Sequence, residues 1–463
     1  MPYAGPGRMF RKVLIANRGE IAVRVMRACR ELGVGTVAVY STADREALHV
    51  RLADERICIG PPAPEQSYLN IPSLISAAEA RGCDAVHPGY GFLSENGDFA
   101  EACRRSELAF IGPRVRNIKL MGDKARARRF MRRAGVPVLP GSSSSVRTLD
   151  EAEKIAREIG YPLLVKATGG GGGRGLRIVR EASELAPAID AASGEGQAAF
   201  GQPKIYLEKY IEHARHIEFQ ILADQERNVV QLGERECTLQ RRYQKVLEES
   251  PSLALDRRLR ARMGRSALRV ATAVGYTNVG TVEFLLDASG AYYFIEMNTR
   301  VQVEHAVTEM LTGIDIVKEG IRVAAGLPLS LRQRDVVARG HAIECRINAE
   351  DPTTMRPSPG TVRVLRLPGG PGLRVDTALY SGCTVPPHYD SLVAKLVAHG
   401  QDRAEAIARM RSALCELQIE GITTNVAMHV ALLEDRDFLE GRVHTRFLEG
   451  WLAERAFEPA RAS

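Results

Sequence analysis

The first third of the chain alternates short apolar runs with longer segments whose apolar residues recur every three to four positions. Buried strands are predicted at residues 13–16, 36–40, 85–87 and 109–111. Helices are predicted at residues 20–32, 72–80 and 98–105. Strands that alternate with helices in this way are typical of a parallel α/β sheet. The first turn, Asn17-Arg18-Gly19-Glu20, lacks the G-x-G-x-x-G pattern, so no dinucleotide fingerprint is predicted.

From about residue 121 the pattern becomes mixed. A basic helix starts near Asp123, and a link containing Pro328 leads into a final α+β region. Strands are predicted at residues 162–166, 176–179, 205–208, 217–222 and 229–232. Helices are predicted at residues 150–159, 257–274 and 314–325. The chain as a whole therefore reads as an α/β and α+β multidomain protein.

The segment from Tyr292 to His305 carries the strongest polar pattern. Polar residues occupy every second position, namely Glu296, Asn298, Arg300, Gln302 and Glu304. In an extended chain successive side chains point to opposite faces, so all five would share one face. A solvated edge strand can alternate in the same way, and the neighbouring strand is needed to separate the two interpretations.

That neighbour, residues 280–286, is an apolar run with a single acid, Glu283. If Ser289-Gly290 forms a two-residue hairpin loop, Glu283 lies directly opposite Glu296. Opposed Cβ atoms are about 5 Å apart, and like charges there repel each other. A cation between them removes this cost, and oxygen ligands from Glu283, Glu296 and Asn298 suit Mg²⁺ or Mn²⁺. We expect a metal–nucleotide site beside a site for an anionic second substrate.

Five consecutive glycines, Gly169–Gly173, lie between two predicted strands. A flexible linker is the ordinary interpretation of such a run. Lys166 precedes it and Arg174 follows it, and glycine N–H groups can wrap closely around phosphate oxygens. The pattern is not a Walker loop. The glycines and the two flanking basic residues favour a mobile lid that covers phosphate. The dense polar stretch 240–245 predicts a surface loop.

Composition limits the class of protein. The 463 residues are 45% hydrophobic and 26% charged, as in globular multidomain proteins, and no apolar run approaches the ~18 residues of a membrane span. The net charge of +7 is spread along the chain, apart from an arginine cluster at 126–133 that suits a solvated helix. A nucleotide explains this balance as well as nucleic acid does. The eight scattered cysteines form no C-x-x-C pair, which predicts buried free thiols in a reducing cytoplasm.

The motifs together closely resemble those of biotin carboxylase, the ATP-grasp component of biotin-dependent carboxylases of the acetyl-CoA carboxylase type. They occur in family order along essentially the whole chain. The matching segments are IANRGEIA (15–22), HPGYGFLSEN (87–96), MGDKA (121–125), VKATGGGGGRG (165–175), EKY (208–210), RHIEFQ (215–220), QRRYQK (240–245), IEMNTRVQVEH (295–305), ECRINAEDP (344–352) and PSPG (357–360).

The resemblance implies three domains and a reaction. The three implied domains are an N-terminal Rossmann-like (pre-ATP-grasp) domain at 1–120, an ATP-grasp domain at 121–330 with a lid at about 139–210, and a C-terminal biotin carboxylase domain at 331–455. The implied reaction is ATP-dependent carboxylation of biotin by bicarbonate through carboxyphosphate, with Mg²⁺ or Mn²⁺. Biotin would be bound to a separate biotin carboxyl carrier protein. Carboxyltransferase subunits and a second copy of the chain are the other implied partners, with no nucleic-acid or membrane partner.

The resemblance also implies roles for individual residues. Nucleotide contacts are expected from Lys124, Lys166, Gly171, Gly172, Gly173, Glu208, Lys209 and His216. The metal ligands would be Glu283 and Glu296, with Asn298 alongside. The bicarbonate site would consist of Lys245, Arg300, Gln302 and Val303. Glu304 would be the general base, and Arg346 would stabilise the biotin enolate.

Two residues depart from the family pattern. Tyr243 replaces the usual histidine of QRRHQK, near the nucleotide, and Ala306 replaces the usual proline of VEHPV. Two other functions stay open. One is a different ATP-grasp ligase that joins a carboxylate to an amine, and the other is a nucleotide-binding subunit without catalysis.

Overall fold

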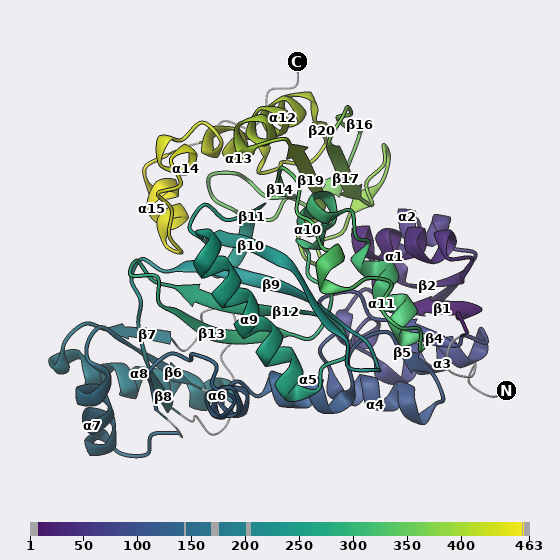
Figure 1. The fold of residues 1–463 in the computed structure, drawn as a ribbon. Helices are drawn as coiled ribbons and strands as arrows, with labels where there is room; N and C mark the ends of the chain where they lie inside the picture. The colour runs from purple at the N-terminus through teal and green to yellow at the C-terminus, as the bar shows by residue number, and fades with distance from the viewer. Residues whose placement is uncertain (1–7, 143–144, 168–175, 201–204, 456, 458–463) are drawn as a thin grey trace.

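The computed structural model describes residues 8–142, 145–167, 176–200, 205–455 and 457 (Figure 1). Its N-terminal sheet is parallel, with strand order β3-β2-β1-β4-β5, which confirms the predicted α/β pattern. The strands are β1 Lys12–Ile15, β2 Gly35–Ser41, β3 Glu55–Gly60, β4 Ala85–His87 and β5 Ala109–Phe110. The helices are α1 Gly19–Glu31, α2 Leu48–Leu52, α3 Ile71–Ala80 and α4 Gly97–Arg105. Strand β3 and helix α2 were not predicted.

The largest sheet is antiparallel and has eight strands in the order β13-β12-β9-β10-β11-β14-β19-β17. Its first five strands are β9 Arg215–Ala223, β10 Val229–Arg241, β11 Gln244–Ser250, β12 Asn278–Leu286 and β13 Tyr292–Asn298. The other three are β14 His341–Asn348, β17 Leu373–Thr377 and β19 Leu392–Gly400. One continuous sheet therefore crosses the predicted boundary at residue 331.

Helix α9 (Arg257–Val274) covers one face of this sheet (Figure 1). Its buried residues pack on Ile217, Phe219 and Phe284, and burying one such phenylalanine contributes roughly 1.5–3 kcal/mol. Because side chains alternate along a strand, the apolar residues of β9 face α9, while its polar residues His216 and Glu218 face the opposite side. The polar face of the sheet is the one that carries the candidate site.

A separate three-stranded sheet, β7-β6-β8, lies at the lower left of Figure 1. It consists of β6 Leu163–Ala167, β7 Leu176–Val179 and β8 Ile205–Lys209, with helices α7 Leu149–Ile159 and α8 Leu185–Phe200. Its small core includes Ala152, Leu163, Val165 and Leu207. Helix α8 was not predicted. The small sheet therefore has a core of its own, separate from that of the large sheet.

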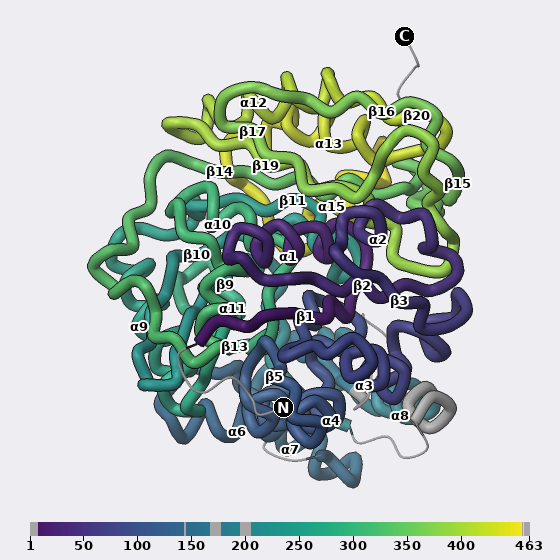
Figure 2. Tube along the Cα trace, turned by 90° about the vertical axis from the view of Figure 1, so that its right-hand side faces the viewer, coloured from purple at the N-terminus to yellow at the C-terminus, as the bar shows by residue number. Residues whose placement is uncertain are grey.

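The remaining helices connect and cover these sheets. They are α5 Val115–Gly122, α6 Lys124–Arg133, α10 His305–Thr312, α11 Ile316–Ala324, α12 Arg403–Glu416, α13 Val426–Leu432, α14 Arg436–Leu439 and α15 Phe447–Ala453. Two small pairs of strands complete the fold, β15 Gly360–Thr361 with β18 Thr384–Val385, and β16 Val364–Arg366 with β20 Gln418–Glu420. In Figure 2 helix α1 lies beneath the C-terminal elements, and it packs against β17 and β19.

Two expectations from composition can be compared with the structure. Within the described ranges, no helix is both long enough and apolar enough to cross a membrane. All eight cysteines are free, as predicted. Cys58 and Cys415 are nevertheless exposed, so the expectation that every thiol is buried was wrong.

Candidate active site

The hairpin β12–β13 brings Glu283 opposite Glu296, as the sequence predicted. The predicted two-residue loop Ser289-Gly290 was wrong, because Leu286 pairs with Tyr292 and the loop spans 287–291. The register changes between Glu283 and Phe284, which pairs with Phe294, so Ile295 is an extra residue in β13. This β-bulge restores the opposition of the two carboxylates.

The chain beyond β13 is not the continuous extended segment that the alternation predicted. Strand β13 ends at Asn298, and Glu304 immediately precedes helix α10. The polar side chains still meet, because the irregular segment turns back toward the sheet. Gln302 Nε2 donates to Glu283 Oε1 at 3.0 Å, and Arg300 Nη2 donates to Asn298 Oδ1 at 3.0 Å.

Lys245 lies at the centre of three carboxylates. Its Nζ donates to Glu218 Oε2 at 2.5 Å, to Glu283 Oε1 at 2.9 Å and to Glu304 Oε1 at 2.7 Å. The lysine side chain is 11% exposed, and those of Glu218 and Glu304 are fully buried. One ammonium thus satisfies acids from β9, β12 and the start of α10, and it fixes these elements relative to one another.

These contacts set the protonation states. Burial lowers the pKa of Lys245, but the charges of Glu218, Glu283 and Glu304 outweigh burial and hold this pKa well above its ordinary value. Burial likewise raises the pKa of Glu304, and the charges of Lys245, Arg346 and Arg235 reverse the shift and leave it lowered. Lys245 is therefore charged and Glu304 ionised at neutral pH.

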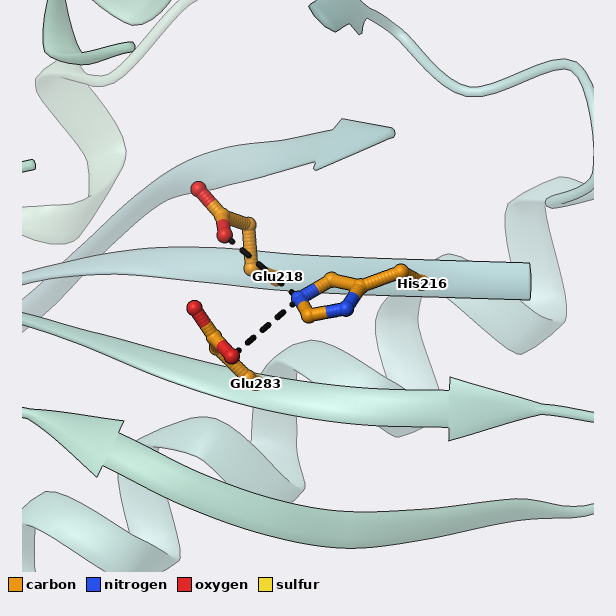
Figure 3. Close-up of side chains that lie close together, drawn as sticks. All are labelled: His216, Glu218 and Glu283. Carbon is orange, nitrogen blue, oxygen red and sulfur yellow. Dashed lines mark ion pairs between the residues drawn. The ribbon is translucent and has the colours of Figure 1, made fainter. Parts of the chain in front are cut away.

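His216 points between Glu218 and Glu283 (Figure 3). Its Nε2 lies 3.2 Å from Glu283 Oε2 and 3.8 Å from Glu218 Oε2. The Gln240 amide nitrogen donates to the Cys237 carbonyl oxygen at 2.8 Å and lies 3.0 Å from His216 Nδ1. An amide nitrogen can only donate, so Nδ1 accepts, and the ring nitrogen that faces Glu283, Nε2, carries a proton.

The opposed carboxylates fit a hard divalent cation. Glu296 Oε2 accepts from Lys124 Nζ at 2.7 Å, and Glu283 accepts from Lys245 and from the Asn298 amide, the latter at 2.7 Å. Each carboxylate is thus already paired with positive charge, and the donor set of Glu283, Glu296 and Asn298 is all oxygen. This chemistry agrees with Mg²⁺ or Mn²⁺ better than with a thiolate-bound metal.

Arg346 closes the other end of the site. Its Nε donates to Glu248 Oε1 at 2.6 Å, and its Nη2 donates to Glu304 Oε2 at 3.0 Å and also contacts Glu248. Its carbonyl oxygen accepts from His429 Nε2 at 2.8 Å and from Asn425 Nδ2 at 3.0 Å. Both the guanidinium and the backbone of Arg346 are therefore held in place.

Comparison with known proteins identifies the family. The family model for the biotin carboxylase N-terminal domain matches residues 9–118, and that for its C-terminal domain matches 344–450. The ATP-binding domain of the carbamoyl-phosphate synthase L chain matches 123–332. A biotin carboxylase from Nostoc sp. is 56% identical over 441 residues, which cover 95% of this chain and 99% of the relative. The chain belongs to the biotin carboxylase family.

Solved biotin carboxylase structures agree with this assignment. A complex of the Campylobacter jejuni biotin carboxylase with β-γ-ATP has a TM-score of 0.92 at 47% identity, covering 95% of this chain and 99% of that one. The biotin carboxylase domain dimer of Hydrogenobacter thermophilus 2-oxoglutarate carboxylase was solved with MgADP, ADP and bicarbonate. It has a TM-score of 0.91 at 48% identity, covering 97% of this chain and all of that one.

The expected nucleotide residues of the small sheet already have partners within the protein. Glu208 accepts from Arg128 Nη1 at 2.6 Å and contacts Lys166 Nζ. Burial raises the pKa of Glu208, but Lys166 and Arg128 outweigh it and lower the pKa. Lys209 Nζ donates to the Tyr161 carbonyl at 2.9 Å. The expected contacts Gly171, Gly172 and Gly173 lie outside the described residues.

The expected bicarbonate residues lie near the carboxylates. The Val303 contact is made by its backbone: the Val303 carbonyl oxygen accepts a hydrogen bond from Nζ of the fully buried Lys395 at 2.8 Å. Arg300 Nε donates to Glu95 Oε2 at 3.0 Å. Tyr243, the departure from the family motif, is 63% exposed in the turn between β10 and β11. The predicted surface loop at 240–245 is therefore a tight β-hairpin.

The sequence did not reveal several residues of this candidate site. Glu218 faces Glu283 across the β9–β12 pairing, and the fully buried Arg235 donates to Glu218 Oε1 at 2.7 Å. Glu248 holds Arg346, and Glu95 holds Arg300. Glu218 could have been predicted, because it is the single acid in the predicted strand 217–222, as Glu283 is in the strand 280–286.

Proposed function

We propose that this chain carboxylates biotin with bicarbonate and ATP, forming ADP and phosphate. A separate carrier protein would present the biotin, and carboxyltransferase subunits would then move the carboxyl group to the final acceptor. The observation that carries the proposal is the convergence of Lys245, Glu304 and Arg346 beside the Glu283–Glu296 pair. Such a site combines metal-assisted phosphoryl transfer with a base and a second anion-binding group.

The phosphate end of the site is organised by charge. A Mg²⁺ ion held by Glu283, Glu296 and Asn298 would neutralise phosphate oxygens and favour phosphoryl transfer. Lys124 lies at this end of the site, in contact with Glu296. Lys166, now in contact with Glu208, can release that carboxylate and turn to a phosphate. The small sheet would close over the nucleotide as a lid and exclude water, which would hydrolyse carboxyphosphate.

The bicarbonate end supplies the base. An oxygen of bicarbonate attacks the γ-phosphorus, the bond to ADP breaks, and Glu304 accepts the proton of the bicarbonate hydroxyl. Lys245 and Arg346 keep Glu304 ionised and therefore free to take that proton. Their charges also make it a weak base, so the proton must move as the new P–O bond forms and acidifies the hydroxyl. Arg300 suits the planar anion through its forked donors.

The second step uses Arg346. Carboxyphosphate splits into CO₂ and phosphate, and the phosphate removes the proton from the ureido nitrogen of biotin. The negative charge that develops on the ureido oxygen is stabilised by the Arg346 guanidinium. The nitrogen then attacks CO₂ and forms carboxybiotin. Glu248 and the Arg346 backbone contacts keep the guanidinium oriented throughout.

The organisation of the chain is part of the proposal. We infer domains at 1–120, 121–330 and 331–455, with a mobile lid at about 139–210, and a homodimer. The eight free thiols fit a reducing compartment such as the cytoplasm.

The deciding experiment measures ADP release by the purified chain with Mg·ATP, with and without bicarbonate and free biotin. We expect release that requires bicarbonate and rises when biotin is added. Release that is indifferent to biotin would favour a different ATP-grasp ligase. No release under any of these conditions would favour a nucleotide-binding subunit without catalysis.

A further inference from the structure

Two buried acids oppose each other behind Arg346. Glu248 on β11 pairs in register with Glu344 on β14, and both residues are fully buried. Directly opposed Cβ atoms in an antiparallel pair lie about 5 Å apart. The sheet thus holds two carboxyl groups close together in a dry environment, where two negative charges would repel strongly.

The two acids differ in their partners. Glu248 Oε1 takes both contacts from the Arg346 guanidinium. Glu248 Oε2 and both oxygens of Glu344 have no hydrogen-bond partner among the described residues. An ionised carboxylate without donors is costly to bury. Only one of the two acids, Glu248, has the contacts that an anion requires.

The charged groups around Glu344 come from several elements. Burial raises the pKa of Glu344 well above its ordinary value, and the charges of Glu248 and Glu304 raise it further, while Lys395 and Arg346 act in the opposite direction. Tyr90 is also close to Glu344, but its hydroxyl donates to Glu20 and not to Glu344. The pair therefore holds a proton at neutral pH, and the lack of partners places it on Glu344.

We propose that Glu248 is the positioning residue that aims the Arg346 guanidinium at the reacting groups, and that Glu344 is its neutral, proton-bearing partner. This inference rests on the proposed function and adds to it. One guanidinium bridges Glu248 and Glu304, so its position depends on a balance between two anions. A third anion at Glu344 would draw Arg346 away from Glu304, and a proton on Glu344 prevents this.

The neighbouring residue Glu249 provides a matched control. It lies on the opposite face of β11, is also buried, and also has an arginine partner, Arg403. His341 Nε2 lies 2.8 Å from Glu249 Oε2, and Arg403 Nε donates to the same oxygen at 2.7 Å. Replacing Glu249 by glutamine disturbs the same strand to a similar degree but leaves Arg346 untouched.

The test compares Glu248→Gln with Glu249→Gln. Two quantities are measured for each variant. The first is the ratio of biotin-stimulated to biotin-independent ADP release, and the second is the KM for free biotin. A misplacement of about 1 Å costs up to about 100-fold, so we expect the Glu248→Gln ratio to fall at least tenfold. Glu249→Gln should keep the wild-type ratio. A wild-type ratio in folded Glu248→Gln overturns the proposal.

A shorter acid covers the case in which Glu248→Gln does not fold. Glu248→Asp keeps the charge and withdraws the carboxylate, so its ratio should lie between those of wild type and Glu248→Gln. A wild-type ratio in Glu248→Asp, with Glu248→Gln unfolded, would also overturn the inference. Absence of biotin stimulation in the wild type is a different result, because it rejects the proposed function itself.

The proton on Glu344 has a direct readout. Infrared difference spectra of wild type and Glu344→Gln at neutral pH should show a protonated carboxyl C=O stretch that the variant lacks. Loss of only carboxylate bands in Glu344→Gln would show that Glu344 is ionised and would overturn its assigned role.

Discussion

Lys245 Nζ lies 2.7 Å from Glu304 Oε1, so a lysine of β11 neutralises the proposed general base before any substrate binds. The same ammonium also contacts Glu218 and Glu283. The proposed base, the proposed metal ligand Glu283 and the structural acid Glu218 therefore share one counterion, and a change at any of these four groups affects the others.

Replacing Lys245 by methionine should abolish turnover and destabilise the fold. Three buried carboxylates would lose their shared cation, and removing one partner of a buried ion pair typically costs about 3–5 kcal/mol. Denaturant unfolding measures the loss, and ADP release measures activity. Lys119→Met, which breaks only the exposed pair with Asp98, is the control and should change neither quantity much.

Replacing Glu304 by glutamine should lower biotin-dependent ADP release by roughly 10²–10⁴-fold, because loss of a general base typically has that effect. Arg346→Ala should also remove most turnover. Nucleotide binding, measured by titration calorimetry, should persist in both variants because neither residue is expected to contact ATP. A wild-type rate in either variant would remove that residue from the mechanism.

The metal pair can be tested through Glu296, which is the more accessible of the two acids. Glu296→Gln should raise the Mg²⁺ concentration needed for half-maximal ADP release, and it should weaken Mn²⁺ binding measured by electron paramagnetic resonance. Chelation of divalent ions should stop turnover in the wild type. Unchanged Mn²⁺ affinity in Glu296→Gln would contradict the assignment.

The proposed role of Glu248 has a pH signature. Burial raises its pKa to about 7, and Arg346 partly opposes this shift. Below that pH Glu248 is protonated and neutral, so it no longer holds the Arg346 guanidinium by charge. Biotin-stimulated ADP release should therefore rise as the pH increases through about 7. The surrounding charges that share in this titration are Glu304, Lys245 and Glu344. Glu248→Gln should lack this limb of the profile.

The turn at Arg242-Tyr243 is strained, because the φ angles of both residues are positive, at 48° and 66°. A side chain in this region costs roughly 1–2 kcal/mol, and glycine avoids the cost. Tyr243→Gly should therefore be more stable to denaturant than Tyr243→Ala by about 1 kcal/mol. Both variants lose the exposed ring, but the alanine variant keeps Cβ. The difference between their free energies of unfolding therefore measures the cost of the positive φ angle at residue 243.

The sequence predicted local geometry well and long-range geometry poorly. The opposition of Glu283 and Glu296 followed from two adjacent strands and a short turn, although a bulge was needed to produce it. Strand β10 was predicted only at 229–232, because its second half carries the polar residues Glu234, Arg235 and Glu236. These side chains are buried by their ion pairs, and hydrophobicity does not reveal such a strand.

The contact between Glu248 and Arg346 joins residues that are 98 positions apart, and no local pattern links them. The polar side chains from Glu296 to Glu304 do lie near one another, but not for the predicted reason, because the strand ends at Asn298. A turn brings these side chains together instead of a shared strand face. Their chemistry was readable from residue type and order, but their path through space required the tertiary fold.

The continuity of the large sheet limits how this chain can be divided. β11 pairs with β14 through Leu247, Glu248 and Glu249, so cutting the chain near residue 331 would strip β11 of its neighbour. The cut would leave a free strand edge, which favours aggregation, and buried acids without their arginines. The ATP-binding part of this protein is therefore not a portable module, and a gene fragment encoding it alone should yield insoluble protein.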